Sequence, residues 1–336
     1  MKVGIYSPYF GTYGGGERYV LTAAEFFLGR GDRVDIYETG GLNKDKVKDF
    51  FGIDISKANL ISGKKTTFGY DLFFFLSDGG IPFSFAKKNI LHFQTPLKYA
   101  NQKTLANKIK LARFAHVICN SAFTKKEIDR TYAVDSSVIY PPVDIEKFRS
   151  GKKENLILSV GRFTSPTHAN SKKQEILIEA FKELNIPRWK FVLFGWGDAS
   201  YFEKFANGEN IEIISDGDLM TLQKYYSKAK IYWHAAGFGE DLEKFPDRAE
   251  HFGITTVEAM AAGAVPVVFG AGGQKEIVEE GISGFFWKNR KDLISQTAAL
   301  ANDQNMRQRL SCGAENRAKI FSKEVFFQKL AKICAS

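Results

Sequence analysis

The stretch from Glu250 to Gly273 constrains the fold more than any other part of this 336-residue chain. Residues 252–254 (Phe-Gly-Ile) are typical of a turn, and the Ala-, Met- and Glu-rich residues after them favour helix. Gly263 stands where a left-handed residue ends a helix. The apolar run 264–269 predicts a parallel strand that is buried on both faces. A turn, a short helix and a buried strand in this order indicate an α/β fold.

Two carboxylates belong to this segment. Glu250 and Glu258 are eight positions apart, and at about 3.6 residues per turn they would not share one face of a helix. We therefore expect Glu250 before the helix and Glu258 inside it, both bordering one cleft. The first amides of the helix, near Gly253 and Ile254, lack intrahelical partners and carry positive partial charge. Such a helix start suits an anion or a sugar hydroxyl.

The same residues resemble a known family. E-x7-E with an internal Phe-Gly, then EAMAAG and a GG loop, is similar to the donor-site signature of the retaining glycosyltransferases of family 4. Those enzymes have the GT-B fold, in which two Rossmann-like α/β domains with parallel sheets face each other across a cleft. The resemblance implies that Glu250 contacts the donor sugar and Glu258 the ribose of the nucleotide. It also implies that the amides around Gly253 and Ile254 face sugar or phosphate.

A glycine loop near the N-terminus fits the same family. Lys2–Ser7 predicts a strand, and the loop 11–16 opens a helix at Glu17, an order that lets backbone approach a phosphate closely. The spacing is not G-x-G-x-x-G, so a dinucleotide site is poorly supported and a tight turn is the simpler explanation. GGGERY resembles the family's GG-x-E-R segment, in which glycines line the cleft near the donor phosphates and the acceptor. The resemblance gives that place to Gly14 and Gly15.

His92 lies at the end of another predicted strand, residues 89–93. A histidine at the carboxyl end of a strand is expected to face the crevice of an open α/β sheet, although a lone histidine is also often structural. In related glycosyltransferases a histidine of this region lies near the donor sugar or the acceptor. The resemblance therefore makes His92 a candidate catalytic residue.

Two cations follow the first strand of the second half. The predicted strand 155–160 ends at Gly161-Arg162, and a polar loop leads on to Lys172. Arginine as a planar fork and lysine as a point charge suit a diphosphate. GRF…KKQEILIEAF resembles the family's G-R…K-G pattern, in which Arg and Lys neutralise the leaving pyrophosphate. Lys173 stands where the family has glycine, which leaves open which of the two lysines acts.

Two prolines, Pro141 and Pro142, mark the boundary between the halves, because neither can donate a hydrogen bond to a sheet. We expect an N-terminal Rossmann-like acceptor domain over residues 1–145 and a Rossmann-like nucleotide-sugar donor domain over 146–321. In GT-B proteins the last helix, here about 322–336, packs back on the first domain. The charged segment 237–249 is longer than its family counterpart, and its role as a lid, an acceptor contact or a surface excursion stays open.

Composition limits where the chain works. The three cysteines form no C-x-x-C pair, which indicates a reducing cytoplasm. The longest apolar run, near Leu72–Leu76, is far shorter than the roughly 20 residues of a membrane span. Residues 1–150 have a net charge of +7, and residues 98–126 hold seven basic residues and no acid. Such a face attracts an anionic lipid surface, nucleic acid or a phosphate-bearing substrate, or is a solvated surface. We expect a cytoplasmic protein that visits the inner membrane leaflet.

We expect no metal and no cofactor. No cluster of His and Cys suggests a metal site, and Arg162 and Lys172 can supply the positive charge that a metal supplies elsewhere. Residues 216–218 spell D-x-D, the metal motif of a different glycosyltransferase fold. They directly precede a helix predicted from Leu219, so we expect Asp218 to cap that helix.

These features together predict a metal-independent, retaining hexosyltransferase. It would move a sugar from a nucleoside diphosphate sugar to a hydroxyl of a glycan or lipid-linked acceptor, in bacterial surface polysaccharide or glycolipid synthesis. One alternative is a catalytically silent GT-B binding or scaffold protein, against which the intact residues Glu250, Glu258, Arg162 and Lys172 argue. The other is an enzyme of the same fold that acts on nucleic acid, which we do not expect as a partner. The sequence leaves the donor base, the sugar and the acceptor open.

Overall fold

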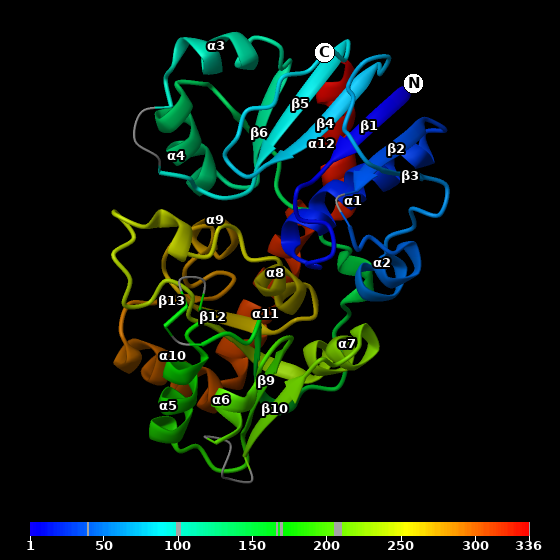
Figure 1. Cartoon of the computed structure of the whole chain (residues 1–336). Coiled ribbons are helices and arrows are strands. Elements are labelled where there is room, and N and C mark those ends of the chain that lie inside the picture. Colours follow the sequence, from blue (N-terminus) through cyan, green and yellow to red (C-terminus); the bar gives the residue numbers. More distant parts are fainter. Residues whose placement is uncertain (39, 99–101, 166, 169–170, 205–209, 336) are drawn as a thin grey trace. The chain divides into compact units, whose positions relative to one another are not determined.

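The protein forms two compact units, each built on its own parallel sheet. The computed structural model describes all residues except 39, 99–101, 166, 169–170, 205–209 and 336. The N-terminal unit comprises Met1–Pro142 and Glu324–Ser336, and the C-terminal unit comprises Val143–Lys323. Both units alternate strands with helices along the chain (Figure 1).

The sheet of the N-terminal unit has seven parallel strands in the order β3-β2-β1-β4-β5-β6-β7. The strands are β1 (Lys2–Tyr6), β2 (Arg33–Glu38), β3 (Asn59–Ser62), β4 (Leu72–Ser77), β5 (Lys88–Phe93), β6 (His116–Cys119) and β7 (Ser137–Val138). The helices are α1 (Gly15–Gly29), α2 (Lys44–Phe51), α3 (Leu105–Leu111), α4 (Ala122–Tyr132) and α12 (Lys323–Ala335).

Strand β4 shows why an uninterrupted apolar run forms the middle of this sheet. Successive side chains of a strand point to opposite faces. Leu72, Phe74 and Leu76 accordingly join the core on one face of the sheet, which includes residues of α1 and α12. Phe73 and Phe75 join the core on the other face, which includes residues of α4. Helices thus cover both faces, as the predicted parallel sheet requires.

The last helix of the chain belongs to the N-terminal unit. Phe326 and Leu330 of α12 are buried in its core, and the Phe326 ring meets the Tyr19 ring edge-on at 5.0 Å between centroids. Figure 1 shows α12, in red, among the blue and cyan elements of this unit.

The sheet of the C-terminal unit has six parallel strands in the order β10-β9-β8-β11-β12-β13. They are β8 (Glu154–Val160), β9 (Lys190–Gly195), β10 (Ile211–Ser215), β11 (Ala229–His234), β12 (Val265–Phe269) and β13 (Phe285–Trp287). The α-helices are α5 (Gln174–Leu184), α6 (Ser200–Glu203), α7 (Leu219–Lys228), α8 (Ile254–Ala261), α9 (Gln274–Ile277), α10 (Arg290–Asn302) and α11 (Gln304–Ala318). Single 3₁₀ turns are η1 (Ile145–Lys147), η2 (Pro246–Arg248) and η3 (Lys319–Phe321).

The segment that opened the sequence analysis folds as predicted. Helix α8 is followed by Gly263, which has φ of +75°, and then by β12. The backbone angle favours glycine here, whereas the nearest atom to an added Cβ would be Oε1 of Glu315, 2.5 Å away at the end of a side chain that can move. The prediction for Asp218 is also confirmed, since its side chain accepts the amide hydrogen of Thr221 at 2.7 Å and caps α7.

The N-terminal glycine loop is closed by a carboxylate of its own chain. Glu17 is only 2% exposed. It accepts hydrogen bonds from the amides of Gly11 at 2.6 Å and Gly14 at 2.8 Å. It also accepts bonds from the amide of Thr12 at 3.2 Å and from its hydroxyl at 2.8 Å. This buried anion therefore satisfies loop amides that the sequence alone made available to a phosphate.

Within the described part of the chain, no helix is long and apolar enough to span a bilayer.

We expect Glu17→Gln to lower the free energy of unfolding of the N-terminal unit by about 2 kcal/mol, because an amide cannot accept all of these bonds and leaves buried donors unpaired. Urea unfolding followed by circular dichroism measures the loss. Tryptophan fluorescence serves as an internal reference, because all four tryptophans lie in the C-terminal unit. Asp45→Asn, at the exposed start of α2, is the matched control, and an equal loss there would contradict this role of Glu17.

Candidate active site

The strand order of the C-terminal unit indicates where a ligand would bind. The chain order runs outward from β8 through β9 to β10 and then resumes on the other side of β8 with β11. Ligands of open α/β sheets bind outside the carboxyl ends of the strands at such a reversal. Strand β8 is followed by Gly161 and Arg162, and β11 ends at His234. The candidate site is therefore built from these two strand ends.

One carboxylate oxygen gathers the side chains at this edge. Oε2 of Glu250 lies 2.7 Å from Nζ of Lys172 and 2.8 Å from Nε2 of His234. The side chains of Glu250, Lys172 and His234 are 16%, 30% and 3% exposed, respectively. We call these three residues the Glu250 centre. It joins the end of β11, the loop before α5 and the loop before α8.

The charge of Glu250 follows from this environment. Burial by itself raises the pKa of a carboxyl, but the Lys172 ammonium and the hydrogen bond with His234 outweigh it and hold the pKa of Glu250 well below its usual range. Glu250 is thus an ionised acceptor, so Nε2 of His234 must carry the hydrogen that the two share. So strong an acid is a poor proton donor or base near neutral pH, and it suits hydrogen bonds to hydroxyl groups instead.

The GG loop holds the backbone of Glu250 by close approach. The amide of Gly273 donates to the carbonyl oxygen of Glu250 at 2.8 Å. A Cβ atom at Gly272 would lie 2.2 Å from that carbonyl oxygen, and one at Gly273 would lie 2.4 Å from Cα of Phe252. Any larger residue would therefore push the loop away from Glu250.

Helix α8 begins where the sequence predicted and contains the second carboxylate. Gly253 precedes it with φ of +119°, and a Cβ atom there would lie 2.8 Å from Nε2 of Gln274. Ile254 is the first residue of the helix, and Glu258 lies inside it, 4% exposed. Oε2 of Glu258 lies 3.0 Å from the hydroxyl of the buried Tyr226. The predicted order, with Glu250 before the helix and Glu258 within it, is confirmed.

The two lysines after β8 have different partners. Lys172 lies against the strand end, since a Cβ atom at Gly161 would be 3.0 Å from Cγ of Lys172, and its ammonium reaches Glu250. Lys173 instead pairs with Glu240 at 2.6 Å. Lys173 has φ of +55°, the left-handed region that favours glycine, so the family's glycine at this position has a conformational reason. Arg162 is exposed beside Gly161.

The predicted site residues of the N-terminal unit lie in other surroundings. Gly14 and Gly15 form the start of α1, where the amide of Gly14 bonds to Glu17. The predicted orientation of His92 toward a crevice is wrong. Its side chain is 0% exposed, and its ring stacks on that of Tyr19 at 3.8 Å between centroids. His92 shares its face of β5 with the core residue Ile90, and burial lowers its pKa to about 3.

Sequence reasoning missed His234 and Tyr226. Only one signal was available for His234, namely its place at the end of a strand that borders the reversal of strand order. Nothing in the sequence pairs Tyr226, on α7, with Glu258 on α8. Across the described residues, no group of three or more His, Cys, Asp and Glu side chains is placed to hold a metal ion.

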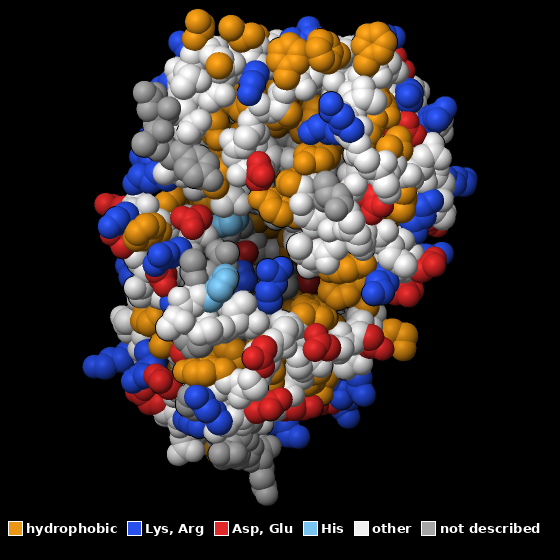
Figure 2. Space-filling model, viewed as in Figure 1, with side chains coloured by type: hydrophobic (Ala, Val, Ile, Leu, Met, Phe, Trp, Pro, Cys, Tyr) orange, Lys and Arg blue, Asp and Glu red, His pale blue; other side chains and the backbone are white. Residues whose placement is uncertain are grey.

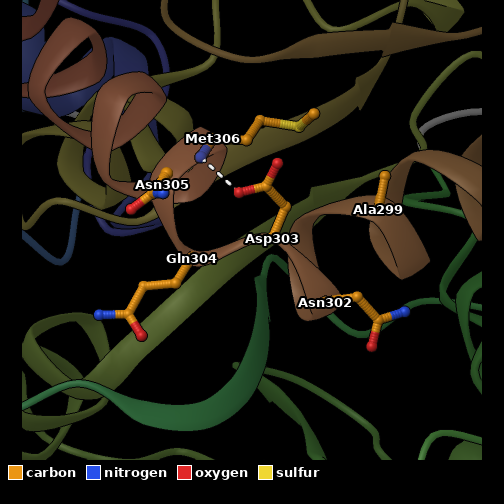
Figure 3. Close-up of a pocket in the computed structure, with 6 residues that line it drawn as sticks. All are labelled: Ala299, Asn302, Asp303, Gln304, Asn305 and Met306. Atoms are coloured by element: carbon orange, nitrogen blue, oxygen red, sulfur yellow. Dashed lines mark hydrogen bonds between the residues drawn. The ribbon is translucent and has the colours of Figure 1, made fainter.

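A separate hollow lies at the turn between α10 and α11 (Figure 3). There Asp303 accepts the amide hydrogen of Met306 at 2.9 Å and caps α11. No predicted site residue is among the residues that line it, which are Ala299, Asn302, Asp303, Gln304, Asn305 and Met306. We therefore place the candidate site at the Glu250 centre and not at this turn.

The depressed pKa of Glu250 makes a prediction about acid stability. A carboxyl whose pKa is lower in the folded than in the unfolded state stabilises the fold above about pH 4.3, and this contribution is lost as the pH falls toward the folded pKa. Glu250→Gln should therefore lower the free energy of unfolding at pH 7 by about 1–3 kcal/mol and make it fall less steeply from pH 5 to 2.

Tryptophan fluorescence in urea reports this unit, which holds all four tryptophans. Lys172→Met should flatten the same pH dependence, and the double variant should add little more, because both changes remove one ion pair. A pH dependence in Glu250→Gln as steep as that of the unchanged protein would show that Glu250 is not the group concerned.

Known proteins agree with this architecture. Residues 142–317 match the family described as glycosyl transferases group 1. An uncharacterised glycosyltransferase of Methanocaldococcus jannaschii is 27% identical, over 65% of this chain and 58% of that protein. The human GDP-Man:Man(3)GlcNAc(2)-PP-Dol alpha-1,2-mannosyltransferase is 27% identical, over 61% of this chain and 43% of its own length. The chain thus spans about half the length of these curated relatives.

Among solved structures, HepE of Anabaena in complex with UDP-glucose has a TM-score of 0.73 and 16% identity, over 100% of this chain and 99% of that chain. This is a likeness of fold, and it agrees with two units that each carry a parallel α/β sheet. Since the family match covers more than half of the sequence, the chain belongs to the glycosyl transferases group 1 family and has the GT-B fold.

Proposed function

We propose that this protein is a retaining, nucleotide-sugar-dependent hexosyltransferase of family 4 that transfers a sugar to an acceptor hydroxyl. The observation that carries the proposal is the Glu250 centre, in which an ionised carboxylate and a lysine meet at the reversal of strand order. The relatives support the donor class, because one solved structure contains UDP-glucose and one curated relative is named for GDP-mannose.

Departure of the diphosphate is the step that needs positive charge. Arg162 and Lys172 follow the same strand end, and the amides at Gly253 and Ile254 add the partial charge of a helix start. In the proposed reaction these groups stabilise the negative charge that grows on the leaving diphosphate. The ammonium of Lys172 then exchanges Glu250 for a phosphate oxygen.

The two carboxylates bind the neutral parts of the donor. Glu250, ionised and partly exposed, accepts hydrogen bonds from hydroxyls of the sugar. Glu258, buried beside the Tyr226 hydroxyl, accepts them from the ribose. In the family these two roles are separate, and here the two side chains belong to different local networks.

The acceptor is assigned to the N-terminal part of the chain. We propose residues 1–145 as the acceptor domain and 146–321 as the donor domain, with Gly14 and Gly15 at the donor phosphates. The amide of Gly14 already bonds to Glu17, so the contribution of these glycines is the absence of side chains and the helix start that follows. His92 is buried against Tyr19, and we assign it to the support of α1 rather than to contact with substrate.

The second candidate function is a GT-B protein that binds without catalysing. It predicts nucleotide binding with no sugar transfer and no donor hydrolysis. The family match and the relatives named as glycosyltransferases favour the enzyme, whereas cations beside Glu250 would serve nucleotide binding in either case.

A nucleotide titration tests the donor site. We expect UDP, GDP or a derived sugar to stabilise the fold by about 2.7 kcal/mol at about 100 times its dissociation constant, a shift on the order of several degrees in melting temperature. Glu250→Gln should not weaken nucleotide binding, because Lys172 loses only the partner that a diphosphate would displace. It should lower turnover about 100-fold, because the sugar contact is lost. Glu258→Gln should weaken nucleotide binding about tenfold, because the ribose contact is lost.

Glu183→Gln, an exposed carboxylate of α5, is the matched control and should change neither quantity. A melting temperature that no nucleoside diphosphate moves would reject the donor site. We also propose that no metal takes part, so turnover should survive EDTA. Strict dependence on added Mg²⁺ or Mn²⁺ would reject that part of the proposal.

We also propose that the protein visits an anionic membrane surface through its N-terminal unit. Helix α3 buries none of its residues, and Leu105 and Ile109 are 74% and 56% exposed. Arg113, just after the helix, donates to carbonyl oxygens of the 83–86 loop, in which Phe83 and Phe85 are also exposed. Hydrophobic side chains gather at the upper edge of Figure 2, where Figure 1 shows α3.

Basic side chains accompany this apolar surface. Lys103, Lys108 and Arg113 are exposed and Lys110 is half-buried, whereas residues 99–101 lie outside the described part of the chain. Each cation near an anionic leaflet contributes about 1 kcal/mol, and inserted apolar side chains add to it. Cations beside exposed Leu, Ile and Phe fit a lipid surface better than they fit a merely solvated face.

Sedimentation with liposomes tests this surface. We expect binding to rise with anionic lipid content and to fall with salt, because it rests on charge. Serine at Lys103, Lys108, Lys110 and Arg113 should weaken it without lowering nucleotide affinity. Leu105→Ser with Ile109→Ser should weaken it without changing its salt dependence. Serine at Lys46, Lys48 and Lys57, other exposed lysines of the same unit, is the control. Equal binding by all variants would leave the basic run as a solvated surface.

A further inference from the structure

Glu240 of segment 237–249 forms two ion pairs. Oε1 of Glu240 lies 2.6 Å from Nζ of Lys173, and Oε2 lies 2.7 Å from Nη1 of Arg248. The side chains of Glu240, Lys173 and Arg248 are 13%, 15% and 32% exposed. We call these three residues the Glu240 clamp. Ion pairs this shielded are held more firmly than pairs on an open surface.

Lys173 has a backbone angle that a glycine would adopt more easily. Its φ of +55° is unfavourable for any residue with a Cβ atom, and a glycine would relieve that strain. The chain nevertheless carries a lysine here, and the ammonium of that lysine reaches across to Glu240. The strained conformation directs Lys172 and Lys173 to different carboxylates, Glu250 and Glu240.

The Glu240 clamp and the Glu250 centre connect the same two segments of the chain. Lys172 and Lys173 are neighbours in the chain, and Arg248 is two residues before Glu250. The direct link between the two segments is the ion pair of Lys172 with Glu250. The indirect link runs from Lys173 through Glu240 to Arg248. In the proposed reaction the direct link is broken, because the Lys172 ammonium moves to the diphosphate, whereas the indirect link stays.

The rest of the segment packs on its own unit. Phe238 lies against Phe269 and Trp287, with ring centroids 5.5 and 5.0 Å apart. The Arg248 guanidinium lies 4.2 Å from the centroid of the Phe245 ring. These contacts and the two ion pairs hold the segment against its own unit.

We propose that Glu240 is a positioning residue that holds the Lys172 loop beside Glu250 after Lys172 has moved from Glu250 to the donor diphosphate. The inference rests on the proposed function for its consequence, but the clamp itself exists without any ligand. It gives segment 237–249 a role and gives a reason for lysine at a position where glycine is the relaxed choice. A chain with glycine at 173 would need another way to fix this loop.

Hydrogen exchange of the unliganded protein tests the clamp by itself. Glu240→Gln should raise amide exchange of the segments 171–176 and 248–254 about tenfold or more, whereas Glu243→Gln, an exposed carboxylate of the same segment, should not. Lys173→Gly should act like Glu240→Gln at 248–254, although it relieves backbone strain. Unchanged exchange in Glu240→Gln would overturn the proposal.

A UDP titration of four proteins tests the consequence. Glu240→Gln should weaken UDP binding about tenfold in the unchanged background, and about twofold or less in Lys172→Met, because the clamp acts through Lys172. The melting temperature should fall equally in both backgrounds. Equal weakening of UDP binding in both backgrounds would show a merely structural role and would overturn the inference. Raised exchange in Glu240→Gln, with a wild type that binds neither UDP nor GDP, would reject the proposed function and leave the clamp in place.

Discussion

A single oxygen atom, Oε2 of Glu250, accepts hydrogen bonds from both Lys172 and His234. The C-terminal unit has to bring both donors to this one atom. A carboxylate removed from water is stable only when its charge is paired and its lone pairs are bonded. The pairing needs a cation from the loop after β8 and an imidazole from the end of β11, which are neighbours only because the strand order reverses there. The pairing of Glu250 therefore depends on the strand order of the sheet.

Glycines near Glu250 contribute because they have no side chain. Gly272 and Gly273 let one loop lie against the backbone of Glu250, and Gly253 turns the chain into α8 with an angle that other residues avoid. In the N-terminal unit the glycine loop serves a different partner, since Glu17 fills it with a carboxylate of the same chain. One glycine loop thus lies against the backbone of a site residue, whereas the other has its amides bonded to a carboxylate that follows it in the chain.

Most of the fold was predictable from local sequence patterns. The apolar run of β4, the turn at Gly253, the stop at Gly263 and the cap at Asp218 each depend on neighbouring residues, and each was predictable. The orientation of His92 failed because parity along β5, and not its place at the strand end, decides which way a side chain points. His234 and Tyr226 could not be found from sequence, because their partners are set by packing between elements. The sequence left the two lysines equivalent, and the structure separates them, since Lys172 reaches Glu250 whereas Lys173, with its left-handed backbone angle, reaches Glu240.

The charges of the unliganded site already balance one another, and this shapes how a donor would enter. Lys172 is occupied by Glu250 and Lys173 by Glu240, so a diphosphate meets these two lysines already paired rather than an open cluster of positive charge. Exposed Arg162 is the group that such an anion can approach first. Lys172 can follow, because its pair is partly exposed and because Glu250 keeps the hydrogen bond from His234 after the lysine departs. In the proposed exchange His234 would leave the mostly buried Glu250 carboxylate with one partner when Lys172 moves away.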